Sequence, residues 1–300
     1  MDDKLQRMFH PVQANGRTAV SSYTEIAPSE ALRPYVSCYW YSEPEWDNVN
    51  SKVQIFSGST IDRVIPDGCC DILFEHYIAH NTYHVRYCGL MEQPFVVTYA
   101  MENSVRRFGI RFFPGGAYGV IQTPLSCLKN QLCELDALLP RSDRTAAEQL
   151  FAEESLLGKV RFAEAFLLSL LRWERVETDN TMKNVLYHIF RSRGSAQITS
   201  IAKKEAISTR QLNRKFQNWI GVTPKKFSEI IRFQAMVHYI EKSKYIDWAE
   251  LALAYGFFDQ PHMIRDFKRY YGVSPVEAVK ECQLGQRNNR FLQYECFRED

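Results

Sequence analysis

The spacing of apolar and polar residues divides the chain into a β-like part and a helical part. Up to Phe113, short runs of apolar, β-branched and aromatic residues alternate with turn sequences such as Pro66-Asp67-Gly68. This pattern predicts short strands joined by tight turns, which together form a barrel or a sandwich. The segments that carry the pattern are Pro28–Tyr41, Ile61–Phe74, Ile72–Leu90, Phe95–Tyr99 and Ser104–Phe113.

From Arg144 onward the apolar residues recur with the helical period of 3.6. A stripe between Val160 and Leu171 contains Ala163, Phe166, Leu167 and Leu170. Such a stripe predicts a helix that buries one side. Three uses remain open: the stripe pairs two subunits, forms the seam between the two domains, or covers the sheet of its own domain.

In the last third of the chain one pattern occurs twice. The first copy runs over Ile198–Gly221 and continues as Val-Thr-Pro; the second runs over Asp247–Gly272 and continues as Val-Ser-Pro. Each copy predicts a short helix, a tight turn and a second helix with basic residues on its polar side. A long helix over Pro224–Ser243 joins the two. Paired helix-turn-helix units of this kind predict a protein that reads two successive major grooves of DNA.

This repeat resembles the DNA-binding domain of the arabinose-regulator (AraC) family of bacterial transcription factors. The second copy carries the more specific part, with Gly256-Phe257, Asp259-Gln260 and Phe267-Lys268 followed by Gly272-Val273-Ser274-Pro275. Pro261 and Met263 depart from the usual residues, but proline is tolerated in the first turn of a helix. The resemblance implies a transcription regulator, with a leaning towards activation, that meets promoter DNA and RNA polymerase.

The second helix of each unit carries the candidate DNA contacts. Ser208 and Asp259 are expected to cap these helices, because both are good N-cap residues. Arginine can bind guanine in bidentate fashion and asparagine can bind adenine, whereas other basic residues contact phosphate. By its match to the family motif, the candidate set is Arg210, Gln211, Asn213, Arg214, Lys215, Gln260, His262, Arg265, Lys268 and Arg269.

The charge distribution supports a DNA-binding role for the C-terminal part. Residues 180–300 hold 20 Lys and Arg against 12 Asp and Glu, whereas residues 1–179 hold 17 against 23. The formal net charge of +2 therefore hides a basic part and an acidic part. Phosphate neutralisation requires the former.

We predict an α+β protein with four segments. They are a β-rich sensor domain (1–158), a helix and linker (159–179), a double helix-turn-helix domain (180–284) and a tail (285–300), with residues 1–20 as a loose arm. No run of 18 apolar residues and no signal sequence is present, so we expect a cytoplasmic protein without a membrane span. We expect no cofactor.

The N-terminal part carries a second resemblance, to an uncharacterised sensor-type domain found ahead of such DNA-binding domains. Its segments are Arg33–Val36, Val64–Phe74 and Phe108–Gly115, of which Pro66-Asp67-Gly68-Cys69-Cys70-Asp71 is the most distinctive. The resemblance implies a small-molecule effector and a homodimer, by analogy only. The alternative is a protein-interaction or oligomerisation module.

The β-rich part contains more aromatic rings than a small core requires. We therefore expect a cavity above about 300 Å³ that touches at least three of ten rings, namely Tyr39, Trp40, Tyr41, Phe74, Tyr77, Tyr87, Phe95, Phe108, Phe112 and Phe113. The alternative is a solid core. The candidate pocket residues are Tyr39, Trp40, Asp67, Phe74, Tyr87, Arg111 and Phe112.

Other residues raise the questions of metal binding, thiol sensing and catalysis. His76, His80, His84 and Cys88 recur every four residues, but residues four apart on a strand are about 13 Å apart, so we expect no metal site. Cys69-Cys70 leaves open a thiol- or metal-responsive sensor. The chain has eight cysteines without a C-x-x-C pair and none of the common catalytic motifs, so we expect free thiols and no enzyme.

Overall fold

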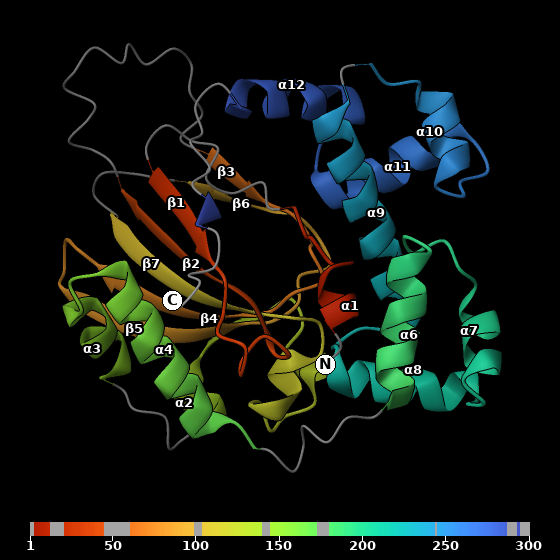
Figure 1. Cartoon of the computed structure of the whole chain (residues 1–300). Coiled ribbons are helices and arrows are strands. Elements are labelled where there is room, and N and C mark those ends of the chain that lie inside the picture. Colours follow the sequence, from red (N-terminus) through yellow and green to blue (C-terminus); the bar gives the residue numbers. More distant parts are fainter. Residues whose placement is uncertain are drawn as a thin grey trace, which may run out of the picture.

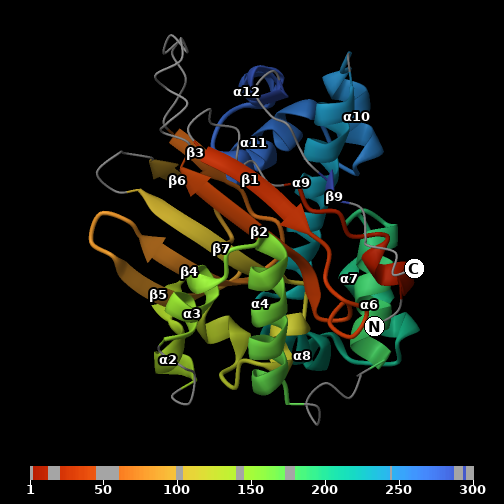
Figure 2. The ribbon, with the colours of Figure 1, turned by 60° about the vertical axis from the view of Figure 1, so that its left-hand side comes forward.

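The computed structural model describes residues 3–12, 21–44, 61–98, 104–139, 145–172, 180–243, 245–286 and 293–294. A β-rich part with its own helices lies beside a purely helical part (Figures 1 and 2). Of the predicted helix and linker (159–179), residues 173–179 lie outside the described residues.

The strands form one large sheet and one small sheet. The large sheet has the order β8-β5-β4-β7-β2-β1-β9, and the small one pairs β3 with β6. The neighbours pair antiparallel except β1 and β9. The strand bounds are β1 Ser21–Ile26, β2 Val36–Pro44, β3 Ile61–Val64, β4 Asp71–Tyr77, β5 Thr82–Cys88, β6 Phe95–Thr98, β7 Val105–Phe112, β8 Leu132–Glu134 and β9 Gln293–Tyr294.

The predicted strands are therefore present, but the expected barrel is not. The large sheet is open in the described part of the chain, because its outer strands β8 and β9 do not pair with each other. The small β3–β6 sheet instead lies over part of the large sheet, which gives a sandwich-like arrangement (Figure 1). A sheet whose other face is covered by helices has no need to close on itself.

Helices cover one face of the large sheet. They are α2 (Leu135–Leu138), α3 (Ala146–Ala152) and α4 (Leu156–Leu170), with the 3₁₀ turns η3 (Gly116–Gly119) and η4 (Leu125–Cys127) nearby. Alternate strand residues point into this layer, where Phe74, Phe108 and Ile110 are completely buried. This layer is the core of the β-rich part.

Most of the apolar stripe on helix α4 faces the sheet of its own domain (Figure 2). Val160, Ala163 and Leu167 belong to the core beneath the sheet, and Phe166 packs edge-on against Phe74 at 5.3 Å. Phe166 and Leu170 are only partly buried in the single chain. Pairing of two subunits through this helix stays a prediction.

The helical part contains two helix-turn-helix units on either side of a central helix, α9 (Pro224–Lys242). Thr223 caps α9 through its hydroxyl oxygen, and Pro224 occupies the first turn, where no N–H partner is lost. The remaining helices are α6 (Asn180–Arg191), α7 (Ile198–Lys204), α8 (Thr209–Trp219), α10 (Trp248–Ala254), α11 (Gln260–Tyr271) and α12 (Pro275–Gln286).

The described N-terminal residues are not a loose arm. Helix α1 (Asp3–Gln6) lies beside α6 (Figure 1), and Leu5 and Phe9 are buried in the core of the helical part. Phe9 stacks on Phe190 of α6 at 5.1 Å. The sequence expectation failed because two apolar residues four positions apart are a weak helical signal on their own.

Within the described residues, no helix combines the length and the apolar character that crossing a bilayer requires.

Candidate nucleic-acid interface and ligand pocket

Helix α8 presents a polar face over an apolar anchor. Ser208 caps it: the Ser208 hydroxyl accepts from the N–H of Gln211, and the Gln211 side chain accepts from the N–H of Ser208 in return. Leu212 and Phe216 are completely buried on the inner side. The other predicted contacts of this helix are exposed, namely Arg210, Asn213, Arg214 and Lys215.

Gln211 is exposed as well, but its side-chain amide oxygen is engaged in the cap. The far end of α8 rests on the β-rich part, where the ring of Trp219 lies 6.0 Å from that of Tyr118. The polar first turns, with Arg210 and Arg214, extend away from this contact.

Helix α11 repeats the design. Asp259 is its N-cap and accepts from the N–H of His262 at 2.7 Å, while Met263 and Phe267 are buried beneath it. Arg265 and Lys268 are exposed, and Gln260 and His262 are half-buried.

Arg269 differs from the other candidates on α11. Its guanidinium donates to Glu229 of α9 at 2.9 Å and to the Tyr270 hydroxyl. We therefore regard Arg269 first as a structural contact between α11 and α9, and only second as a phosphate contact.

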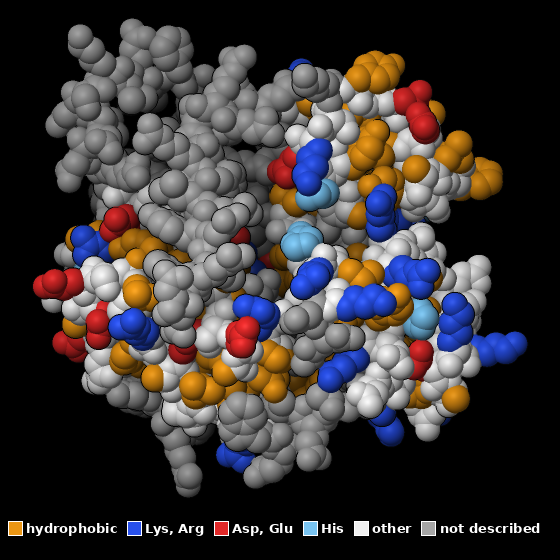
Figure 3. Space-filling model, in the orientation of Figure 1, with side chains coloured by type: hydrophobic (Ala, Val, Ile, Leu, Met, Phe, Trp, Pro, Cys, Tyr) orange, Lys and Arg blue, Asp and Glu red, His pale blue; other side chains and the backbone are white. Residues whose placement is uncertain are grey.

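Basic side chains gather on the helical part of the surface. In the face shown in Figure 3, Lys and Arg predominate over α6 to α8, whereas the part over the sheet mixes both signs of charge. A surface of this kind attracts the phosphate backbone of a nucleic acid.

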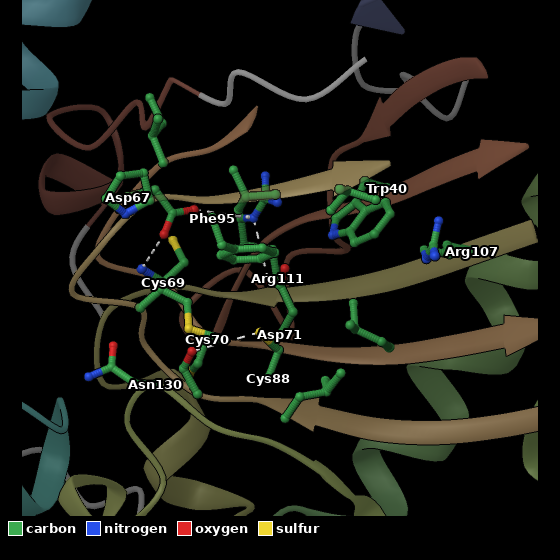
Figure 4. A pocket seen from close by; sticks show the side chains of 18 of the residues that line it. Trp40, Asp67, Cys69, Cys70, Asp71, Cys88, Phe95, Arg107, Arg111 and Asn130 are labelled. Atoms are coloured by element: carbon green, nitrogen blue, oxygen red, sulfur yellow. Dashed lines mark hydrogen bonds and ion pairs between the residues drawn. The ribbon is translucent and has the colours of Figure 1, made fainter. Parts of the chain in front are cut away.

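A cavity of about 710 Å³ lies in the β-rich part, between the large sheet and the small β3–β6 sheet. It adjoins the face of the large sheet that is not covered by α3 and α4. Trp40 and Ser42 of β2, Asp71 and Leu73 of β4, and Arg107 and Arg111 of β7 form its floor. Val64 of β3 and Phe95 and Val97 of β6 form its opposite wall (Figure 4).

Only part of the predicted pocket set lines this cavity. Trp40, Asp67 and Arg111 do, whereas Tyr39, Phe74, Tyr87 and Phe112 lie in the helix-covered core. The reason is the twofold period of a strand, which sends neighbouring residues to opposite faces. Of the ten rings named in the prediction, Trp40 and Phe95 line this cavity, which is one ring short of the predicted three, although its volume exceeds the threshold.

The polar end of the cavity is built around one buried arginine. Arg111 is 2% exposed, and its Nε lies 3.4 Å from Asp71 Oδ1 and 3.6 Å from Asp67 Oδ2. Its Nη1 lies 3.4 Å from Glu25 Oε1. Strand pairing makes this arrangement, because Asp71 of β4 and Cys38 of β2 are the register partners of Arg111 on either side.

Burial shapes the ionisation of this group. Desolvation raises the pKa of Asp71 to about 6, which the positive charge of Arg111 opposes and the charge of Asp67 reinforces. Desolvation also raises the pKa of Asp67, again against Arg111. Burial alone would lower the pKa of Arg111, but the surrounding acidic groups hold it above its ordinary value.

Two features of this site were missed in the sequence. Asp71, Leu73 and Glu75 share a face of β4, a period-two signal that becomes informative once the covered face is known. Gly109 opposes Trp40 in the sheet, and a Cβ at position 109 would lie 2.1 Å from the indole. The glycine therefore makes the room in which the indole lies.

The thiols and histidines do not form a metal centre in the described residues. The pairing of β4 with β5 puts His84 opposite Glu75 and His76 opposite Tyr83, so the two histidines lie on opposite faces of the sheet. Burial raises the pKa of Cys70 to about 12 and that of Cys69 well above its usual value. Neutral thiols are poor nucleophiles, which disfavours the thiol-sensor alternative.

One loop links the cavity to the DNA-binding part. Residues 64–70 line the cavity through Val64, Asp67 and Cys70, and the same loop packs on α9. The Gln234 side chain of α9 donates to the Pro66 carbonyl at 2.7 Å. Gly68, with a φ of +84°, lies so close to Phe227 that a Cβ there would be 3.0 Å from its ring.

Comparison with known proteins places two families on this chain. Residues 201–281 match the family described as "Helix-turn-helix domain", and residues 24–134 match a "Domain of unknown function (DUF6597)". The HTH-type transcriptional regulator MtrA of Neisseria gonorrhoeae is 36% identical over 75 residues, which are 25% of each chain. An uncharacterized HTH-type transcriptional regulator of Haemophilus influenzae is 30% identical over 87 residues, 29% of each chain.

Among solved structures, ToxT of Vibrio cholerae is similar with a TM-score of 0.39 and 13% identity, covering 74% of this chain and 95% of that one. A ToxT structure with bound unsaturated fatty acid gives a TM-score of 0.37 at 12% identity, covering 70% and 86%.

The C-terminal part of this chain is thus a helix-turn-helix domain of the AraC type. It follows a β-rich domain that matches a family of unknown function. The match to the curated relatives spans about a quarter of their length.

Proposed function

We propose that this protein is a sequence-specific DNA-binding transcription regulator whose β-rich domain responds to a small molecule. One observation carries the first half: two capped helices, α8 and α11, each bury an apolar anchor and expose Arg and Lys at the position of a recognition helix. The description of the Neisseria relative as a transcriptional regulator supports the same conclusion.

We assign roles within the two helices by exposure and chemistry. Arg210, Asn213 and Arg214 of α8 and Arg265 of α11 contact base edges, with Gln260 and His262 beside Arg265. Lys215, Lys268 and Arg269 contact phosphate, and Gln211 contributes through the cap. Arginine and asparagine have the bidentate donors and acceptors that distinguish guanine and adenine.

The second half of the proposal concerns the signal. Ile65 and Cys69 line the cavity and at the same time belong to the core of the helical part. A ligand that moves this loop therefore changes the packing of α9, which connects the two recognition helices. The ligand regulates DNA binding if the loop has two arrangements and the ligand binds one of them more tightly than the other.

The location, the partners and the direction of regulation follow from the assignment as a transcription regulator. We place the protein in the cytoplasm with its promoter DNA, acting as an activator that meets RNA polymerase. The unit responsible for DNA binding is residues 180–284, preceded by the sensor domain. In a homodimer the buried residues of the α4 stripe, Val160, Ala163 and Leu167, stay with the sheet of their own domain.

The test begins with selection of a preferred site from random duplex DNA, using the full chain, followed by titration in fluorescence anisotropy. We expect a footprint over two major grooves on one side of the duplex, roughly 10 base pairs apart. Arg214→Ala and Arg265→Ala should each weaken the selected site by about 1–3 kcal/mol and relax the preference at one base position.

Two further variants separate base reading from charge. Lys268→Ala should weaken selected and random DNA alike and lower the salt slope by about one. Arg161→Ala is the matched control, because Arg161 is exposed on α4. No salt-dependent binding, or an equal loss of all sequences with both arginine variants, contradicts the assignment.

A further inference from the structure

Two clusters of charged side chains lie at the cavity, one around Glu75 and one around Arg111, and they differ in net charge. Glu75 accepts from Arg86 at 2.9 Å and from Arg107 at 3.0 Å, and Arg86 also donates to Glu134 at 2.8 Å. This network contains two carboxylates and two guanidiniums and is neutral when all four groups are ionised. It leaves no charge for a ligand to compensate.

The Arg111 group, in contrast, has an excess of negative charge. Asp67 and Asp71 line the cavity and lie within 3.6 Å of one guanidinium, so the carboxylates already outnumber it. Glu25, which is 43% exposed and lies outside the cavity lining, is 3.4 Å from the same guanidinium. Among the described residues that line the cavity there is no lysine or histidine to add positive charge. The thiols of Cys69, Cys70 and Cys88 are neutral, because burial raises the pKa of each.

Hydrogen-bonding capacity is left over at the same place. Asp71 Oδ1 and Arg111 Nε form an ion pair whose geometry is not that of a hydrogen bond, and the buried indole N–H of Trp40 lies near Asp71 without a hydrogen bond of normal geometry. Trp40 and Arg111 are 7% and 2% exposed. Unpaired polar atoms at such depth are costly unless a ligand or water satisfies them. Figure 4 shows these side chains around the cavity.

The rest of the wall is apolar. The volume of the cavity, about 710 Å³, lies within the usual range of small-molecule sites, roughly 300–1,000 Å³. The apolar lining consists of Val64, Ile65, Leu73, Met91, Phe95, Val97 and Leu132. A ligand for this site needs an apolar body and a polar head at one end.

We propose that the cavity binds a small molecule with an apolar body and a cationic nitrogen, and that this nitrogen lies at Asp71 and Asp67 beside the ring of Trp40. The carboxylates attract the cation. The Trp40 ring, which stacks on Tyr23 at 5.8 Å and lies 5.9 Å from the Arg111 guanidinium, forms part of the wall beside it. A carboxylic acid of the same shape meets the same carboxylates with unfavourable charge. This inference names the ligand class of the sensor site in the proposed function, and only its regulatory meaning rests on that function.

The experiment compares four probes that share one body: 4-phenylbutylamine, its N-acetyl derivative, 4-phenylbutan-1-ol and 4-phenylbutyric acid. Thermal unfolding of the full chain at pH 7.5, backed by calorimetric titration, gives the ranking. We expect the amine to raise Tm and to bind at least ten-fold more tightly than the acid, with the two neutral probes between them. Equal binding of all four, preference for the acid, or no binding of any probe overturns the proposal.

A pair of variants locates the site. Asp71→Asn should remove the preference for the amine over its acetyl derivative, whereas Glu148→Gln, an exposed carboxylate on α3 at the other face of the sheet, should keep it. If Asp71→Asn does not fold, Trp fluorescence of the unmodified chain is compared with that of a Trp40→Phe variant; quenching by the amine that is absent in Trp40→Phe supports the site, and equal quenching in both chains contradicts it. Retained preference in a folded Asp71→Asn protein contradicts the site.

DNA binding is measured separately in the same samples. Amine binding that leaves DNA affinity unchanged supports the ligand class and removes the sensor role. Amine binding in a chain that does not bind DNA supports the ligand class and removes only the regulator function.

Discussion

The two faces of the large sheet come from the same strands but have different chemistry. The face under α3 and α4 is a solid layer in which Phe74 and Phe108 stack edge-to-face at 6.2 Å. The opposite face carries Asp71, Glu75 and Arg111 around a cavity. A strand of seven residues, β4, supplies both, because its side chains alternate.

This difference shows where specificity can be built in a sheet. Apolar rings pack against one another and leave little space, so abundance of aromatic residues indicates a core more than a pocket. Buried charges need partners, and here these are other polar groups of the same face. The polar face is therefore the one that can select a ligand.

The largest expected effect is a difference in stability between substitutions at two neighbouring residues of β4, one on each face of the sheet. Phe74→Ala should lower the free energy of unfolding by about 3–5 kcal/mol, because Phe74 is completely buried among rings. Leu73→Ala, on the cavity side, should cost about 1 kcal/mol, as expected for a half-buried site. Chemical denaturation measures both; similar losses would mean that the cavity face is packed as tightly as the core.

A second test fills the space that Trp40 uses. Gly109→Ala puts a methyl group against the indole and should cost about 1–3 kcal/mol. Trp40→Ala removes the indole that the new methyl group would meet. The double variant should therefore lose less free energy of unfolding than the two single variants lose together. Additive losses in this double-mutant cycle would show that the two residues do not meet.

The charged face should also make stability depend on pH. Since the pKa of Asp71 in the folded protein is about 6, against about 3.9 unfolded, the folded state binds more protons between these values. The free energy of unfolding therefore falls as pH rises from about 4 to about 6, by about 2 kcal/mol from this group. Asp71→Asn should flatten the profile over this window in urea titrations, and an unchanged slope would contradict the raised pKa.

The smallest expected effect is kinetic and concerns the thiols. Cys127 in η4 is exposed, whereas Cys69 is buried beside the cavity with a raised pKa. Brief treatment with N-ethylmaleimide at pH 7.5, followed by peptide mass spectrometry, should label Cys127 well before Cys69, because the thiolate is the reactive form and Cys127 is accessible. Early labelling of Cys69 would revive the thiol-sensor alternative.

Much of the fold was predictable because its signals are local. Turn residues such as Pro66-Asp67-Gly68 and caps such as Ser208 and Asp259 act through neighbouring backbone groups, so their positions follow from short sequence windows. The helix-turn-helix repeat was predictable for the same reason. The DNA contacts themselves stay a prediction.

The pocket was less predictable because its residues are brought together by register. Nothing in the sequence near Arg111 indicates that Asp71, forty residues earlier, is its partner across β4 and β7. Tyr39 and Phe74 point towards the layer of α3 and α4. The sequence of the strands alone does not tell which face of the sheet these helices cover. Adjacent residues were therefore assigned to one site although the sheet separates them.

The burial of the N-terminal residues has a consequence for how the chain acquires its structure. Val12 exchanges hydrogen bonds with Gln234, a residue 222 positions later, and Phe9 packs on Phe190. At ribosomal speeds of about 5–20 residues per second, the partner of Val12 emerges roughly 10–45 seconds after it. During that interval Leu5 and Phe9 have no completed core to enter. Docking of this segment is thus a late, long-range event, because residues 5–12 wait for the helix between the two helix-turn-helix units.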